Sequence, residues 1–394
     1  MNQNQEVDRL PLGALLVLAA TGFSAIVTET LPAGLLPQVA SDFGVSQGAA
    51  GQLVTIYALG SVAAAIPLVT LTQSLPRKPL LIAALMGLLL GNLISAASHS
   101  YQVTLVARFC SGVAAGLGWG MLGGYARRMV VDRLKGRALA LAMAGTPLAL
   151  AVGVPLGTFA GGAIGWRVAV FATCGLLLLL IVAAALWMPN SAGQPPDRKL
   201  SNLAVLRLPG VTAVLATAFT WVTAHYILYT YVAPYAAWAG YADSVGLLLL
   251  FFGVAAIGGI WISGVMVERH LRLHVLTSLI AFAATTMALA LVAHGSIMVF
   301  AAIIVWGVTF GGAATSIQTA ASDAAGEGVD LVGAMLTTVW NSAIAAGGAI
   351  GAMLLQKSDV RMFFPVMLLL ILAALAMAFA ARVRGFRSGD RATR

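Results

Sequence analysis

Charged residues are scarce in this sequence. Only 9% of its 394 residues are Asp, Glu, Lys or Arg, while 60% are hydrophobic. A soluble globular protein carries roughly 25% charged residues, so a water-soluble fold of this length could not cover its surface. The composition therefore excludes a soluble enzyme or binding domain, and it predicts that lipid surrounds most of the chain. The 43 glycines agree, because small residues let membrane helices approach closely.

Cysteine and catalytic motifs are also nearly absent. Cys110 and Cys174 are the only cysteines, and they form neither a disulfide framework nor a metal-ligand spacing. The sequence contains no HExxH motif. Its first ten residues lack the basic segment of a cleaved signal peptide, so the first apolar run is expected to remain as an anchor. We expect no enzyme activity, no metal and no organic cofactor.

The net charge of +9 does not indicate a nucleic-acid partner. The basic residues lie in short loops between apolar runs, where membrane topology uses them. The expected partners are the lipid bilayer, protons and a small-molecule substrate, and we expect a monomer.

Apolar runs of bilayer length make up most of the chain. A helix needs about 20 apolar residues to cross the hydrocarbon core. We therefore predict an all-α membrane protein with twelve transmembrane helices. The spans are near residues 12–37, 49–71, 79–98, 102–126, 138–161, 168–188, 209–237, 244–267, 274–293, 297–320, 332–355 and 362–382.

Lys and Arg are distributed unequally between alternate loops. One side of the predicted membrane holds most of these residues, and the other side holds only Arg167, Lys357 and Arg361. Arg108 lies inside a span. Because cytoplasmic loops carry the excess of Lys and Arg, both termini are predicted to be cytoplasmic. The predicted cytoplasmic side holds 18 of the 22 basic residues: Arg9, Arg77, Lys78, Arg127, Arg128, Arg133, Lys135, Arg137, Arg198, Lys199, Arg207, Arg269, Arg272, Arg382, Arg384, Arg387, Arg391 and Arg394.

The longest polar connection divides the chain into two similar parts. We predict a six-helix half at 1–188, a cytoplasmic linker at 189–208 and a second half at 209–394. Pro37 and Pro234 end their spans and are 197 residues apart. Repeated halves around a central site are a common transporter plan. At nearly the same offset, Arg77 and Lys78 match Arg269 and Arg272. The Gly-rich span 5, with Gly153, Gly157 and Gly161, corresponds to span 11, with Gly347, Gly348 and Gly351.

Two opposite charges are predicted at similar depth. An ionisable side chain in the bilayer costs about 2.5–3.5 kcal/mol and is a functional candidate by default. Glu29 lies about 12 Å, and Arg108 about 10 Å, from the outer ends of their spans at the helical rise. If spans 1 and 4 are neighbours, Glu29 can bind a proton and Arg108 can tune that binding. The alternative is a static ion pair that only fixes helix packing.

Span 7 carries a second titratable group. His225 lies nine residues before Pro234, much as Glu29 lies eight before Pro37. With Tyr226 and Tyr229 it suits a cavity for an amphipathic or hydroxylated solute. The alternative is an aromatic packing cluster. Weaker substrate candidates are Asn341, Trp340 and Gln318, together with Asn92, Trp119 and Gln52.

The strings TETLPAGLLPQVASDFGVS, GQLVTIYALG, GVPLGTFAGGAIGWR and TAHYILYTYVAPY resemble the major facilitator superfamily. More closely, they resemble its twelve-span drug:proton antiporters, in a bacterial group that includes sugar and arabinose efflux transporters and chloramphenicol exporters. The resemblance covers nearly the whole chain. It implies proton-coupled export through the bacterial inner membrane. Arg108 and Gly112 match the signature of span 4, and the resemblance implies that Arg108 takes part in proton coupling.

Two signatures of this group are altered here. In the loop after span 2, Arg77 and Lys78 fit the pattern, but Gln73 replaces its Asp and Pro76 its Gly. In span 5 the glycine spacing is kept, but a proline stands between the glycines. The resemblance implies that the second-half loop carries more of a cytoplasmic charge latch. The implied gating residues are Arg77, Lys78, Gly264, Glu268, Arg269, Arg272, Gly153, Pro155, Gly157 and Gly161.

The leading hypothesis is export of small organic solutes, drugs or sugars, by alternating access, with the proton gradient as energy source. Import by a symporter or facilitator stays open, because the fold permits either direction. A receptor or scaffold would need a soluble domain, which the loops do not provide. Sugars, amphenicols, purine nucleosides and lipophilic cations are all compatible with the sequence.

Overall fold

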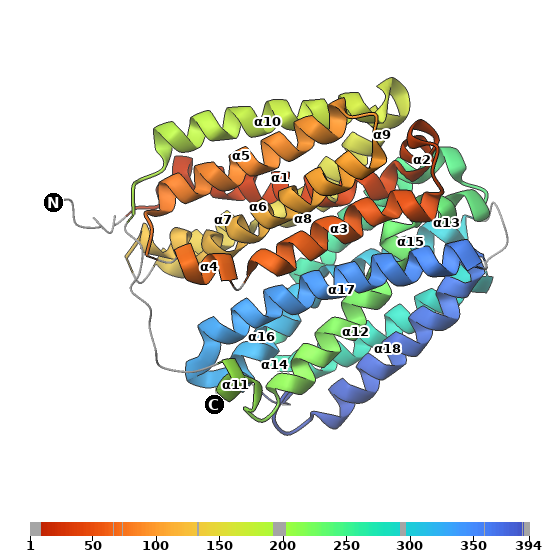
Figure 1. Cartoon of the computed structure of the whole chain (residues 1–394). Coiled ribbons are helices and arrows are strands. Elements are labelled where there is room, and N and C mark those ends of the chain that lie inside the picture. Colours follow the sequence, from red (N-terminus) through yellow and green to blue (C-terminus); the bar gives the residue numbers. More distant parts are fainter. Residues whose placement is uncertain are drawn as a thin grey trace. The chain divides into compact units, whose positions relative to one another are not determined.

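The computed structural model describes residues 9–65, 67–72, 74–131, 134–191, 202–291, 297–357, 359–387 and 389. Helices account for the regular structure of these residues, and none of them is in a strand (Figure 1). The predicted all-α class is confirmed. Ten helical stretches of the described chain are long and apolar enough to cross a membrane.

The difference between ten stretches and twelve predicted spans has two sources. Helix α14 (Val245–Leu291) has 47 residues, hence a length of about 70 Å, more than twice the hydrocarbon thickness. Its backbone leaves helical geometry at His270 (φ −133°, ψ 35°), between two predicted spans. The predicted span 49–71 corresponds to α3 (Gln47–Ala65) and α4 (Pro67–Thr72), which are not among the ten. The number twelve stays a prediction.

The chain forms two compact units. Unit 1 comprises the described residues of Met1–Gly44 and Ile56–Asp197, and unit 2 those of Val45–Thr55 and Arg198–Arg394. Helix α3 is thus divided between the units. The other main helices of unit 1 are α1 (Leu12–Gly34), α2 (Leu36–Phe43), α5 (Arg77–Ala97), α6 (Tyr101–Arg128), α7 (Lys135–Met143), α8 (Gly145–Leu148), α9 (Val154–Ile164) and α10 (Trp166–Trp187).

Unit 2 repeats the plan of a long helix followed by a short one. Of the predicted linker, residues 192–201 lie outside the described residues, and α11 (Asn202–Leu206) is a short helix within it. The remaining helices are α12 (Val211–Thr230), α13 (Val232–Trp238), α14, α15 (Met298–Gly311), α16 (Ala313–Ala325), α17 (Val329–Lys357) and α18 (Phe363–Ala380).

The prolines predicted to end spans 1 and 7 lie instead in the short helices that follow. The break after α1 is at Leu35, and Pro37 stands in the first turn of α2. The break after α12 is at Tyr231, and Pro234 is the third residue of α13. A proline is tolerated there because the first N–H groups of a helix have no intrahelical acceptor. Each break therefore precedes its proline by two or three residues.

A basic side chain caps the last turn of a helix in each unit. Lys78 donates to the carbonyl oxygen of Ala185 (2.6 Å), near the end of α10. Arg272 donates to the carbonyl oxygens of Ala378 and Phe379 (both 3.0 Å), near the end of α18. Cations stabilise the negative end of a helix dipole. Lys78 and Arg272 are 194 residues apart, so this contact recurs with the sequence repeat.

Candidate functional site

Glycines bring α6 against the second part of α3 in unit 1. A Cβ at Gly112 would overlap the carbonyl oxygen of Tyr57, and a Cβ at Gly60 would overlap that of Phe109. This backbone approach places Arg108 beside the Tyr57 ring, with Cζ 4.7 Å from the ring centroid. The Tyr57 hydroxyl donates to the carbonyl oxygen of Ala25 in α1 (3.1 Å), which fixes the ring.

Arg108 binds the backbone of α1 where a proline interrupts its hydrogen bonding. Pro32 lies inside α1 and has no N–H, so the carbonyl of Thr28 lacks its intrahelical donor. The Arg108 guanidinium donates to that oxygen and, at 3.0 Å, to the carbonyl oxygen of Glu29. Asn92 of α5 donates to the Thr28 hydroxyl (2.9 Å). The proline therefore creates the acceptor that holds the cation.

The Glu29 carboxyl lies in the same cluster. Glu29 is 2% exposed and Arg108 3%, and they are close enough for their charges to interact. Among the described residues, Glu29 Oε1 has no hydrogen-bond donor. Burying an unpaired carboxylate costs several kcal/mol. A neutral acid, or a carboxylate paired with Arg108, would avoid this cost.

The structure therefore brings Glu29 and Arg108 together, as the depth argument requires. Tyr57 and Thr28 were not found by sequence reasoning. A buried tyrosine or threonine in an apolar span carries no signal of its own, although the repeat described below includes Tyr57.

Unit 2 contains a cluster built in the same way. A Cβ at Gly307 of α15 would lie 2.8 Å from Ala255 Cβ of α14, and one at Gly311 would overlap the carbonyl oxygen of Ala256. The close approach of α15 to α14 brings Trp306 to His225 of α12, and the indole Nε1–H donates to His225 Nδ1 (3.0 Å).

Aromatic rings surround His225. Phe310 is stacked on it, with ring centroids 3.4 Å apart and planes at 4°, and Tyr229 is stacked at 5.1 Å and 28°. Tyr226 and Phe252 contact the imidazole at 4.9 Å and 5.6 Å. His225, Tyr226 and Tyr229 are therefore brought together, as predicted.

The two clusters occupy corresponding positions of the repeat. Glu29 and His225 are 196 residues apart, Tyr57 and Phe252 are 195 apart, and Arg108 and Trp306 are 198 apart. Trp306, Phe252 and Phe310 were missed by sequence reasoning. The repeat offset, applied to Arg108, was the signal that could have found Trp306.

Among the described residues, Trp340, Asn341 and Gln318 make no hydrogen bond or ring contact with His225. Trp340 is half-buried and contacts Phe310 of the cluster, with ring centroids 6.0 Å apart. The Asn341 amide donates to the carbonyl oxygen of Thr337 in its own helix (3.0 Å). Gln318 is exposed on α16. The sequence alone did not distinguish these residues from those in contact with His225, because each is a polar or aromatic residue within a span.

The glycines of span 5 form a packing surface for α1. The span contains a π-helical turn (Ala149–Gly153), and Pro155 stands in the first turn of α9. A Cβ at Gly153, Gly157 or Gly161 would lie 2.6–2.7 Å from other side chains. Those side chains are Phe23, Val27 and Leu31 of α1 and Leu35 directly after it.

Some residues of the loop signatures contact other helices or segments, and others are exposed. Arg77 is buried and its main-chain N–H donates to Ser191 O (2.9 Å), while Lys78 and Arg272 cap helices. Glu268 and Arg269 are exposed, and the space where a Cβ would stand at Gly264 is open. Gln73 lies outside the described residues. The gating roles of all these residues stay predictions.

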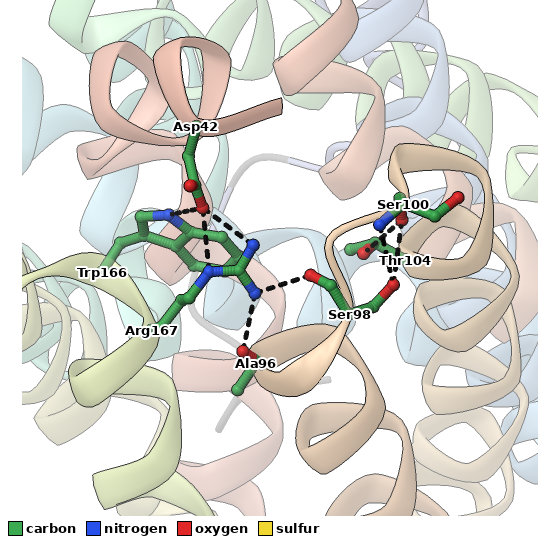
Figure 2. Close-up of polar contacts among 7 residues, drawn as sticks. All are labelled: Asp42, Ala96, Ser98, Ser100, Thr104, Trp166 and Arg167. Atoms are coloured by element: carbon green, nitrogen blue, oxygen red, sulfur yellow. Dashed lines mark hydrogen bonds and ion pairs between the residues drawn. The ribbon is translucent and has the colours of Figure 1, made fainter. Parts of the chain in front are cut away.

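A further polar cluster, missed by sequence reasoning, joins α2, the end of α5 and the start of α10 (Figure 2). Asp42 accepts hydrogen bonds from Trp166 Nε1 and Arg167 Nε, both at 2.9 Å. Arg167 also donates to the carbonyl oxygens of Ala96 (2.7 Å) and Ser98 (2.6 Å), which end α5. Trp166 and Arg167 belong to the GWR of a string quoted above, which was the available signal.

Comparison with known proteins identifies the family. The model described as Major Facilitator Superfamily matches residues 18–352. The purine ribonucleoside efflux pump NepI of Escherichia coli (strain K12) is 29% identical over 364 residues, 91% of this chain and 91% of that protein. NepI of Shigella dysenteriae serotype 1 (strain Sd197) is 28% identical, over 91% and 92% of the two chains.

A solved structure shows the same fold. The human organic anion transporter MFSD10 (TETRAN) has a TM-score of 0.68 and 14% sequence identity, covering 94% of this chain and 100% of that one. The resemblance to the superfamily is thus confirmed. This chain belongs to the Major Facilitator Superfamily and is a multi-pass membrane transporter rather than an enzyme.

Proposed function

We propose that this transporter exports small organic solutes in exchange for protons, and that purine ribonucleosides are among its substrates. The observation that carries the proton coupling is the buried Glu29 carboxyl beside an Arg108 anchored to the Pro32 break. The substrate class follows from the curated relatives, which are named purine ribonucleoside efflux pumps. Drugs and sugars, the wider class expected from the sequence, are secondary candidates.

In the proposed cycle a proton from outside neutralises Glu29 and ends its pairing with Arg108. The solute leaves by alternating access, and the proton is then released to the cytoplasm. Arg108 stays fixed to α1 throughout, so the carboxyl alone switches partner. The proposed location is a bacterial inner membrane with both termini cytoplasmic.

Purified protein in liposomes tests this proposal. An antiporter accumulates radiolabelled inosine when the liposome interior is more acidic than the medium, whereas a symporter does so under the opposite gradient. A facilitator shows no dependence on either gradient. We expect accumulation with the acidic interior.

The variant Glu29→Gln keeps the size of the side chain and removes its proton exchange. We expect gradient-driven accumulation to fall to the level of protein-free liposomes, while exchange of labelled for unlabelled inosine without a gradient continues. Asp243→Asn, at an exposed carboxylate, is the matched control and should behave as the wild type. Normal gradient-driven transport by Glu29→Gln would remove Glu29 from the mechanism.

A further inference from the structure

The hydrogen bond from Trp306 determines which nitrogen of His225 carries the proton. An indole N–H can only donate, so Nδ1, which receives it at 3.0 Å, must keep its lone pair free. A neutral imidazole has one proton, which must then be on Nε2. Both side chains are buried, Trp306 completely. The pairing therefore selects one tautomer.

The direction of the remaining N–H is fixed as well. Phe310 and Tyr229 stack on the imidazole and hold its plane. The close contact of Gly307 with α14 holds the helix that carries Trp306 and Phe310. Among the described residues, His225 Nε2 donates no hydrogen bond to the protein. The ring thus presents one donor, in one direction, to whatever binds beside it.

The same contact opposes a second proton on His225. A proton on Nδ1 would face the indole N–H and abolish the hydrogen bond. The described residues in ring contact with His225 include two titratable ones, Tyr226 and Tyr229, both on α12. The rings supplied by α14 and α15, those of Phe252, Trp306 and Phe310, carry no charge.

We propose that Trp306 is a positioning residue that holds His225 as a neutral Nε2–H donor for an acceptor atom of the transported solute. The inference rests on the proposed function in placing the solute at His225. Purine ring nitrogens are acceptors of the required kind, whereas an organic cation offers the wrong charge and no acceptor. His225, although it corresponds to Glu29, is then a recognition group and not a second proton carrier.

Nitrogen NMR of the full-length protein in lipid nanodiscs, with ¹⁵N-labelled histidine, reads the tautomer without any substrate. The chain has five histidines, so His225→Gln assigns the signal. We expect an unprotonated Nδ1 and a protonated Nε2 that persist over the pH range in which a free imidazole titrates. A proton on Nδ1 of His225, or a second proton taken up by its ring within that pH range, would overturn the proposal.

Trp306→Phe provides the second arm, with Trp261→Phe as matched control, because Trp261 is 71% exposed. Trp306→Phe should give His225 a mixture of tautomers and raise the KM for inosine about three- to tenfold, as loss of one oriented hydrogen bond implies, with little change in kcat. The control should leave both unchanged. An unchanged KM with Trp306→Phe would remove Trp306 from solute recognition.

The two arms also separate this inference from the proposed function. If the wild type transports no purine ribonucleoside, the proposed substrate is wrong, and the wild-type NMR signal still decides the tautomer. If inosine is transported but Nδ1 carries the proton, the function stands and the role of Trp306 is refuted.

Discussion

The clusters around Glu29 and His225 use the same helices of the repeat for different chemistry. In unit 1 the partner from α6 is Arg108, which binds backbone carbonyls beside a carboxyl. In unit 2 the partner from α15 is Trp306, which binds an imidazole nitrogen directly. The first cluster contains opposite charges, and the second contains uncharged rings. This difference underlies the division of work that we propose, with proton exchange in one unit and solute recognition in the other.

Removing the partner from each cluster should have unequal effects on stability. Arg108→Ala leaves the Thr28 carbonyl without a donor and Glu29 without a cation, which we expect to cost about 3–5 kcal/mol. Trp306→Phe leaves one imidazole nitrogen unpaired, for a loss of about 1–3 kcal/mol. Chemical denaturation in detergent, followed by tryptophan fluorescence, measures both.

Arg108→Lys is the informative control for the larger effect. An ammonium keeps the charge but lacks the planar fork of the guanidinium, so it should recover only part of the lost stability. Equal stability of Arg108→Ala and the wild type would show that the carbonyl contacts at Pro32 do not hold the cluster together.

Two arginines on the predicted outer side should also differ in how much their removal lowers the stability of the protein, but by less. Arg167 and Asp42 are joined at 2.8 Å with side chains 20% and 37% exposed, and Arg167 also caps α5. Arg361, 194 residues later, lies 3.8 Å from Asp359, with side chains 69% and 53% exposed. We expect Arg167→Ala to cost about 1–3 kcal/mol and Arg361→Ala less than about 0.5 kcal/mol. A larger loss of stability for Arg361→Ala than for Arg167→Ala in the same denaturation experiment would contradict this expectation.

Sequence reasoning found the charged cluster more completely than the aromatic one, for a physical reason. Glu29 and Arg108 are conspicuous because charges are rare in apolar spans, and the helical rise gave their common depth. Trp306 and Phe252 resemble lipid-facing or core residues until a tertiary contact shows their partner. The glycine contacts that place them depend on helix packing, which no single span encodes.

The helices were predicted well in position and less well at their ends. Hydrophobic length located the membrane helices, and the basic loops marked the ends that Lys78 and Arg272 cap. The break at Leu35 was displaced from the predicted Pro37, because a proline fits the first turn of the next helix. The connection around His270 was predicted as a loop, and the backbone does leave helical geometry there, but the break is confined to His270.

Counting the protons exchanged when a nucleoside binds tests the division of work most directly. Calorimetry of inosine binding in buffers of different ionisation enthalpy gives this number for the wild type, Glu29→Gln and Trp306→Phe. The account predicts proton exchange in the wild type, the same number in Trp306→Phe despite weaker binding, and none in Glu29→Gln. Undiminished proton exchange in Glu29→Gln, or its loss in Trp306→Phe, would contradict the account.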